Sequence, residues 1–158
     1  MSSNIQSSIP EKYLGGIASQ CLVKGVHFMG RGTGVYATDR RIIVVSGLKA
    51  IAVAKVLGET FGEGFADTVI LDNKRVDNEK AIRELEDKKE FEIFKENISR
   101  IEIQVKRGKL EWGGYFNILA KDGVETKIVI TDHLHNEGYE YLKALMQTAC
   151  PDTLSVQG

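Results

Sequence analysis

Three residues in the last third of the sequence have side chains that could bind a metal ion. Asp132, His133 and His135 lie close together, and carboxylate and imidazole groups are common zinc ligands. Zinc needs three or four ligands, and the remaining histidine and the cysteines are distant in the sequence. We interpret the three residues as the polar approach to a helix and predict no metal, cofactor or catalytic residue. A metal-binding protein or enzyme that uses them is kept as an alternative.

A second polar feature is a glycine-bracketed turn with the only tryptophan of the chain. Trp112 lies near Lys106, Arg107 and Lys109. A tryptophan among cations can contact a membrane interface or a protein partner, or it can fold back and cover the end of a core. We take these four residues as a candidate binding patch. Three arginines in other predicted turns are added to it: Arg31, Arg40 and Arg41.

A third pattern, Gly32-x-Gly34-x-x-Ala37, fits the loose form of the dinucleotide-binding fingerprint. That fingerprint needs a helix directly after it, so that a phosphate meets free N–H groups. Residues 41–45 are instead rich in β-branched side chains and predict a strand. We therefore expect no nucleotide here.

The overall charge limits the classes of partner. The formal net charge is -1, and the sequence pI is about 6.3. This balance excludes non-specific nucleic-acid binding through a basic field. Residues 1–10 are polar and lack the apolar core of a signal peptide. We expect a cytoplasmic protein, with peripheral attachment to a membrane left open.

Hydrophobic periodicity predicts antiparallel strands followed by one helix. Gly15-Gly16 is expected to interrupt the chain, and residues 21–29 are expected to form one strand. Asp122-Gly123 is a strong hairpin signal. An apolar stripe predicts an amphipathic helix over residues 137–149. Alternating or β-branched runs predict further strands over residues 33–38, 41–46, 91–94, 98–106, 115–120 and 124–130.

Residues 47–89 interrupt the strand pattern with two helical segments. Alanine-rich residues 48–65 favour a helix, and Asp77 is placed to cap a second helix over residues 79–89. Small residues recur at every fourth position of the first segment and make a smooth face: Ala50, Ala54, Gly58 and Gly62. That face suits packing on the chain's own sheet or helix, which we favour, or self-association.

Two stretches resemble a known family. Residues 34–44 read Gly-Val-Tyr-Ala-Thr-Asp-Arg-Arg-Ile-Ile-Val, and residues 91–103 run from a short strand through a small turn into an Ile-x-x-Ile strand. Both resemble bacterial and archaeal PH-like (GRAM-like) domains. The resemblance implies a partly open barrel or sandwich that is capped by a C-terminal amphipathic helix. In inositide-binding PH domains a basic stretch begins as Lys24 and Arg31 do here, but Thr33 departs from that pattern.

Together these features predict a single α+β, mainly antiparallel domain over residues 1–158. Residues 1–15 are expected to be a flexible N-terminus, and residues 47–89 a helical insertion. We predict a non-catalytic PH-like binding or adaptor module for a protein partner or an anionic membrane surface. A homo-oligomeric scaffold that uses the small-residue face is the first alternative.

Overall fold

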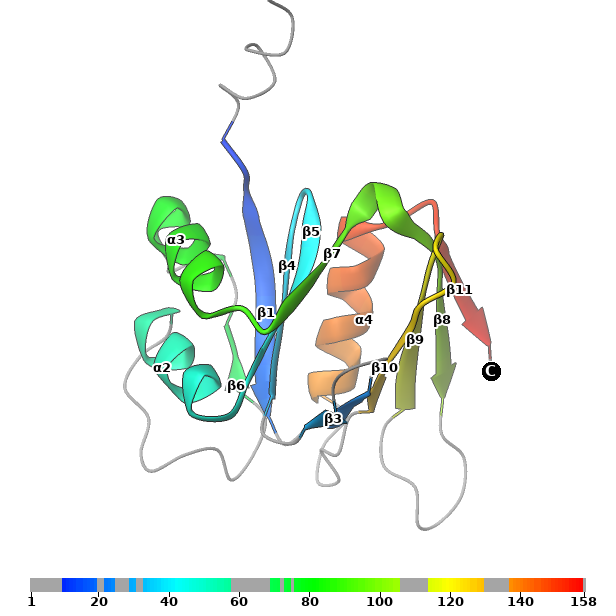
Figure 1. Cartoon of the computed structure of the whole chain (residues 1–158), viewed down its shortest axis with the longest axis horizontal. Helices are drawn as coiled ribbons and strands as arrows, with labels where there is room; N and C mark the ends of the chain where they lie inside the picture. Colours follow the sequence, from blue (N-terminus) through cyan, green and yellow to red (C-terminus); the bar gives the residue numbers. More distant parts are fainter. Residues whose placement is uncertain are drawn as a thin grey trace, which may run out of the picture.

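The computed structural model describes residues 10–19, 22–24, 29–30, 33–57, 69–71, 73–74, 76–105, 114–129 and 137–157. Its strands form two sheets (Figure 1). The five-stranded sheet has the order β6-β1-β4-β5-β7, and the six-stranded sheet has the order β11-β8-β9-β10-β2-β3. No closed barrel joins the strands of the described residues, because each belongs to one of these two sheets.

The five-stranded sheet is antiparallel throughout. Its β4–β5 hairpin turns at Asp39 and Arg40, as the sequence predicts. Its strands are β1 (Tyr13–Ser19), β4 (Thr33–Thr38), β5 (Arg41–Ser46), β6 (Val69–Ile70) and β7 (Phe91–Phe94).

The six-stranded sheet is antiparallel except for one pair, β11 with β8. A short 3-10 turn, η1 (Lys95–Asn97), leads from β7 into this sheet. Its strands are β2 (Leu22–Lys24), β3 (Met29–Gly30), β8 (Ile98–Val105), β9 (Gly114–Ala120), β10 (Glu125–Val129) and β11 (Leu154–Gln157).

The larger core lies between the two sheets and surrounds α4 (Glu137–Ala149) (Figure 1). Alternate residues of β4, β5, β8 and β9 point into it, among them Ile101 and Ile103 of β8. Leu142, Met146 and other residues of the α4 stripe fill its centre. The predicted period of 3.6 in this helix and of 2 in the strands is therefore confirmed.

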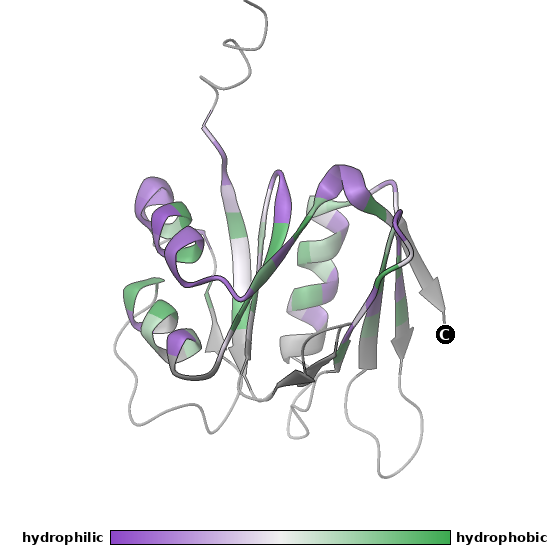
Figure 2. Cartoon of the chain, in the orientation of Figure 1, coloured by the Kyte–Doolittle hydropathy of each residue, from purple (hydrophilic) through white to green (hydrophobic). Residues whose placement is uncertain are grey.

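A second core covers the other face of the five-stranded sheet. The helices α2 (Gly47–Leu57) and α3 (Asn78–Lys88) pack there, against the β5 residues Ile43 and Val45. Ile42 and Val44 of the same strand face the larger core. Burial on both faces explains why β5 is apolar at consecutive positions. The two covering helices differ in hydropathy (Figure 2): α2 is mostly hydrophobic, whereas α3 is largely hydrophilic outside its inner stripe.

The two described helices of the insertion, α2 and α3, therefore pack on the chain's own sheet, which is the arrangement that we favoured for this segment. Ala50 is fully buried in the second core. Asp77 caps α3 as predicted, because its side chain accepts a hydrogen bond from the Lys80 N–H at 3.0 Å. Ala81 and Leu85 form the buried stripe of that helix.

The sequence-based expectations were wrong around the first strands. Gly15 and Gly16 do not interrupt the chain but lie inside β1, where the register shifts between Tyr13 and Gly15. The strand thus begins within the range that we expected to be flexible. Residues 21–29 do not form one strand, because β2 and β3 pair with each other in antiparallel fashion.

Two further details differ from the predicted pattern. Val124, with which the predicted strand over residues 124–130 begins, is 37% exposed, since it lies in the turn before β10 rather than in the strand. The strand β11 was missed altogether, because the four residues of this strand are too few for a reliable period.

Candidate functional site

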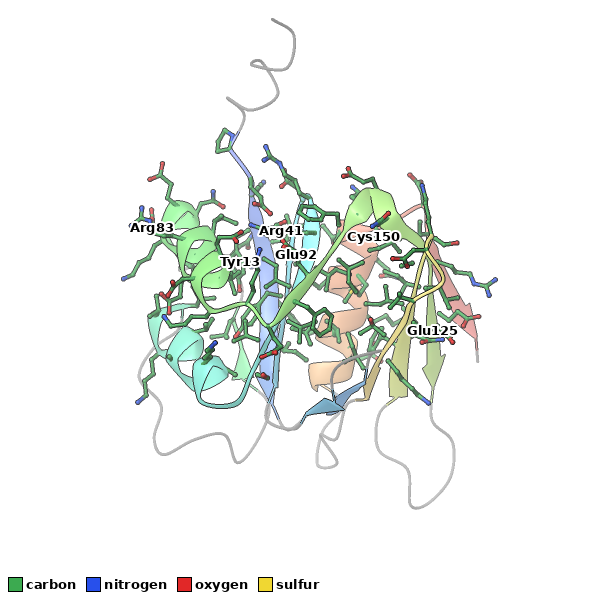
Figure 3. All side chains as sticks on the ribbon, viewed as in Figure 1. Tyr13, Arg41, Arg83, Glu92, Glu125 and Cys150 are labelled. Atoms are coloured by element: carbon green, nitrogen blue, oxygen red, sulfur yellow. The ribbon has the colours of Figure 1, made fainter. Side chains whose placement is uncertain are left out.

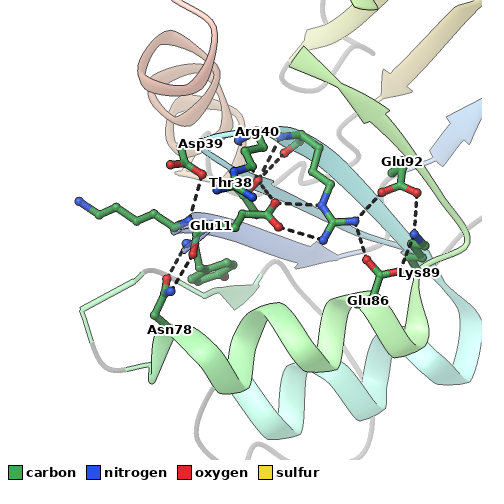
Figure 4. Close-up of polar contacts among 11 residues, drawn as sticks. Glu11, Thr38, Asp39, Arg40, Asn78, Glu86, Lys89 and Glu92 are labelled. Carbon is green, nitrogen blue, oxygen red and sulfur yellow. Dashed lines mark hydrogen bonds and ion pairs between the residues drawn. The ribbon is translucent and has the colours of Figure 1, made fainter. Parts of the chain in front are cut away.

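Arg41 of β5 forms the most extensive ionic cluster of the described residues (Figure 4). Its side chain is only 7% exposed, and three carboxylates from different elements contact the guanidinium group. Nη1 lies 2.7 Å from Glu86 of α3 and 2.5 Å from Glu92 of β7. Nε and Nη2 bind both oxygens of Glu11, at 2.9 and 3.0 Å. We name Glu11, Arg41, Glu86, Lys89 and Glu92 the Arg41 cluster.

Lys89 connects the two carboxylates of α3 and β7. Its Nζ lies 2.6 Å from Glu86 and 2.6 Å from Glu92. Hydrogen bonds from Lys89 and Arg41 lower the pKa of Glu86. Burial by itself would raise the pKa of Glu92, but hydrogen bonds from Lys89 and Arg41 outweigh this and lower it. Both carboxylates are therefore ionised near neutral pH.

The cluster holds the segment before β1 against the sheet, although we expected that segment to be flexible. The Lys12 N–H donates to Asp39 Oδ1 at 3.0 Å. Asn78, the first residue of α3, accepts from the Tyr13 N–H and donates to the Glu11 carbonyl, at 2.7 and 2.8 Å. Residues 11–13 are thus anchored by both main-chain and side-chain bonds (Figure 4).

Burial separates the two neighbouring arginines of the predicted binding patch. As members of a binding patch both are expected to be exposed; Arg40 is exposed, but Arg41 is buried, so the expectation is wrong for Arg41. The hydroxyl oxygen of Thr38 fixes this turn by accepting from the Arg40 and Arg41 N–H groups, each at 3.0 Å. Alternation along β5 then directs Arg41 toward α3 and β7.

The two arginines also line different grooves. The first groove, of about 660 Å³, is lined by Glu11, Arg41 and one side of α3 from Asn78 to Asp87. The second groove, of about 540 Å³, lies at the β4–β5 turn and includes Arg40. The structure therefore does not bring Arg40 and Arg41 together in one patch.

The second groove combines charges of both signs with an exposed aromatic ring. Phe94 is 42% exposed, which makes it one of two large hydrophobic residues exposed among the described side chains, the other being Val124. The guanidinium carbon of Arg41 lies 5.9 Å from the ring centroid of Phe94. The charged lining residues are Asp39, Arg40, Lys95, Glu96, Lys121 and Asp152.

Cys150 contributes to the second groove at the end of α4 (Figure 3). Its side chain is 3% exposed. Burial raises the pKa of the thiol, and this outweighs the opposite effects of Lys95 and Thr153. Cys150 is therefore protonated at neutral pH and is a poor nucleophile.

Most of the other predicted site residues lie outside the described residues. These are Arg31, Lys106, Arg107, Lys109 and Trp112 of the binding patch, Gly58 and Gly62 of the small-residue face, and Asp132, His133 and His135. The side chain of Ala54 is likewise not described. Within the described part of the chain, no group of three or more histidine, cysteine, aspartate or glutamate side chains could hold a metal ion.

Sequence reasoning missed the three carboxylates that surround Arg41. They lie 30, 45 and 51 positions away from it, beyond the reach of any helical or strand period. A charged residue at the start of an otherwise apolar strand was the one available signal, because a buried arginine requires partners.

Comparisons with protein-family models, curated proteins and solved structures found no match for this chain. Among the described helices, none has the length and apolar character needed to cross a membrane.

Proposed function

We propose that this chain is a non-catalytic, PH-like binding module whose ligand is a protein. The order of elements supports the PH-like part of the proposal. The strands β1, β4, β5 and β7 pair in succession in one sheet, β8, β9 and β10 pair in succession in the other, and α4 packs between them. The family resemblance implies the same sequence of a hairpin, a later strand pair and a closing helix.

The second groove is the observation that carries the proposed protein ligand. Phe94 offers an exposed aromatic surface beside the groove, and aromatic side chains are frequent anchors in protein interfaces. Three cations and three carboxylates line the groove. Such a lining suits a polypeptide, which presents apolar groups and charges of both signs.

The same charge balance argues against a lipid ligand in this groove. Binding to an anionic bilayer depends on uncompensated lysines and arginines. Here Asp39, Glu96 and Asp152 offset Arg40, Lys95 and Lys121. The membrane version of the proposal therefore depends on Trp112 and its neighbours rather than on this groove.

The charged groups of the described residues suit binding better than catalysis. Arg41 is occupied by three carboxylates, and two of these are further neutralised by Lys89. The thiol of Cys150 is protonated, because burial raises its pKa. A nucleophile or general base instead needs a pKa that its surroundings have shifted toward the working pH.

A selection from a library of short random peptides tests the protein ligand. The immobilised full chain should enrich a peptide family, and Phe94→Ser should weaken binding of the enriched peptides by about tenfold or more. Val124→Ser is the matched control, because it removes the other exposed hydrophobic side chain. It should leave binding unchanged. Failure to enrich any peptide, or equal losses in both variants, would contradict the proposal.

Co-sedimentation with anionic vesicles at low salt tests the membrane version. Binding that is lost in Trp112→Ala but kept in Phe94→Ser would replace the protein ligand by a bilayer. Absence of vesicle binding, together with Phe94-dependent peptide binding, is the result that we expect.

A further inference from the structure

The strand β11 adds to the six-stranded sheet in an unusual way. It runs parallel to β8, whereas every other pair in that sheet is antiparallel. It also lies at the edge of the sheet, and among the strands that the structure describes β8 is its only partner. The outer edge of β8 would present unpaired main-chain groups if β11 were absent, and such an edge readily accepts another strand.

The contacts of β11 with β8 are main-chain bonds at buried positions. The Ile101 N–H donates to the Thr153 carbonyl at 2.8 Å, and the register then pairs Leu154 with Ile101 and Val156 with Ile103. In a parallel pair the bonds of one strand come from alternate residues. The Ser155 N–H is therefore a donor to β8, and the N–H groups of Ile101 and Ile103 both face β11. Ile101 and Ile103 are fully buried.

The connection to β11 is anchored at the end of α4, where Thr153 donates its N–H and its hydroxyl to the Cys150 carbonyl, both at 3.3 Å. Met146, Ala149 and Cys150 are buried at the end of α4, and the Cys150 N–H continues the helix by donating to the Met146 carbonyl at 2.8 Å. Pro151 and Asp152 are exposed. Residues after Cys150 can consequently leave β8 without removing a side chain of α4 from the core.

This connection also borders the second groove. Pro151, Asp152 and Thr153 line the groove together with Arg40 and Lys95. A protein held in the groove therefore touches the turn that leads into β11 and lies close to the outer edge of β8.

We propose that the outer edge of β8 is a strand-binding site, which β11 occupies within the chain and which an extended segment of the protein ligand occupies when β11 leaves. The inference rests on the proposed protein-binding function. The incoming segment runs parallel to β8 and alternates apolar with polar residues, because the structure shows this edge paired with Leu154-Ser155-Val156-Gln157. Main-chain bonds supply the contact, as in other cases of strand addition.

The test uses the full chain and a synthetic peptide of residues 152–158 as the probe. Ser155→Pro removes one of the main-chain donors of β11, whereas Ser155→Ala retains it and serves as the matched control. The peptide should bind the Ser155→Pro chain about tenfold or more tighter than the wild-type and Ser155→Ala chains, because β11 no longer competes. A peptide that is N-methylated at Ser155 should not bind, while N-methylation at Val156 should have little effect.

Amide hydrogen exchange locates the binding. In Ser155→Pro, the amides of Ile101 and Ile103 should exchange faster than in the wild type, and the peptide should restore their protection. The Glu102 amide faces β9 and should stay protected throughout. A folded Ser155→Pro chain that binds no peptide, or that binds it without protecting Ile101, would overturn the inference.

If Ser155→Pro fails to fold, amide hydrogen exchange in the wild-type chain tests whether β11 leaves β8. Exchange of Ile101 while Glu102 remains protected supports local release of β11, and equal exchange of the two amides overturns it. These results are independent of Phe94. Loss of the strand site with intact Phe94-dependent peptide binding would leave the proposed function standing, and the reverse result would contradict the proposed function while leaving β8 able to accept a strand.

Discussion

The guanidinium group of Arg41 donates hydrogen bonds to both carboxylate oxygens of Glu11, at 2.9 and 3.0 Å, although the two residues lie 30 positions apart in the sequence. The side chains are 7% and 10% exposed. Two parallel bonds between such groups are strong and directional. This pair fixes the segment before β1 to the start of β5, beside the β4–β5 turn.

Removing one partner of this pair should reduce stability. Glu11→Gln leaves the buried guanidinium with two carboxylates instead of three, and we expect a loss of about 1–3 kcal/mol in the free energy of unfolding. Glu86→Gln is the matched control, because Glu86 is 52% exposed and its loss should cost about 0–1 kcal/mol. Urea unfolding measures both, and equal losses would contradict the role given to Glu11.

The cluster also predicts a pH dependence. The pKa values of Glu86 and Glu92 are lowered from the ordinary 4.5 in the folded chain, so the unfolded chain binds protons more readily. Their contribution to stability is present above about pH 4.5 and is lost as the pH falls through the lowered pKa values. Glu92→Gln should be less stable than wild type near neutral pH, and this difference should shrink in acid. A difference that is constant with pH would contradict the prediction.

Gly16 is predicted to tolerate no side chain. A Cβ at this position would lie 2.2 Å from the Tyr36 ring and 2.8 Å from the Val35 carbonyl oxygen, and both residues are fully buried. Gly16→Ala should lower the free energy of unfolding by about 3 kcal/mol through overpacking. Gly123 has a positive φ of 94° but open space around it, so Gly123→Ala should cost only about 1 kcal/mol. Thermal or urea unfolding compares the two, and similar losses would argue against close packing of β1 on β4.

Cys150 should react slowly with thiol reagents. Burial shields the sulfur and raises its pKa above the ordinary 9.0, so little thiolate is present or accessible. In a Cys21→Ser background, we expect labelling of Cys150 about tenfold or more slower than that of a short cysteine peptide at the same pH, and rapid labelling in urea. Labelling of the folded chain as fast as the peptide would show that the end of α4 opens readily.

Periodicity in the sequence predicted the central elements of the fold. Ile101 and Ile103 alternate with polar neighbours, and both are buried in the structure. The apolar stripe of residues 137–149 likewise marks the face of α4 that fills the larger core. Burial of one face of a strand or helix imposes these patterns locally, so they can be recognised without knowing which elements pack against that face.

The sequence was less informative where a strand is buried on two faces or is very short. The consecutive apolar residues Ile42 to Val45 predicted a strand but not the second core that covers it. Gly15 and Gly16 suggested a break, whereas packing against Tyr36 and Tyr141 makes glycine necessary inside β1. The strand β11, which pairs in parallel with β8, has too few residues to be recognised from the sequence.

The sequence by itself determined the class of the fold, α+β with mainly antiparallel strands and a closing amphipathic helix, because hydrophobic period depends on neighbours only a few residues away. The tertiary structure alone decided that Arg41 is buried rather than solvated, that Glu11, Glu86 and Glu92 surround it, and that Phe94 lies exposed beside a groove of mixed charge. These relationships join residues from separate elements, and an ion pair between distant segments leaves no periodic trace in the chain that encodes it.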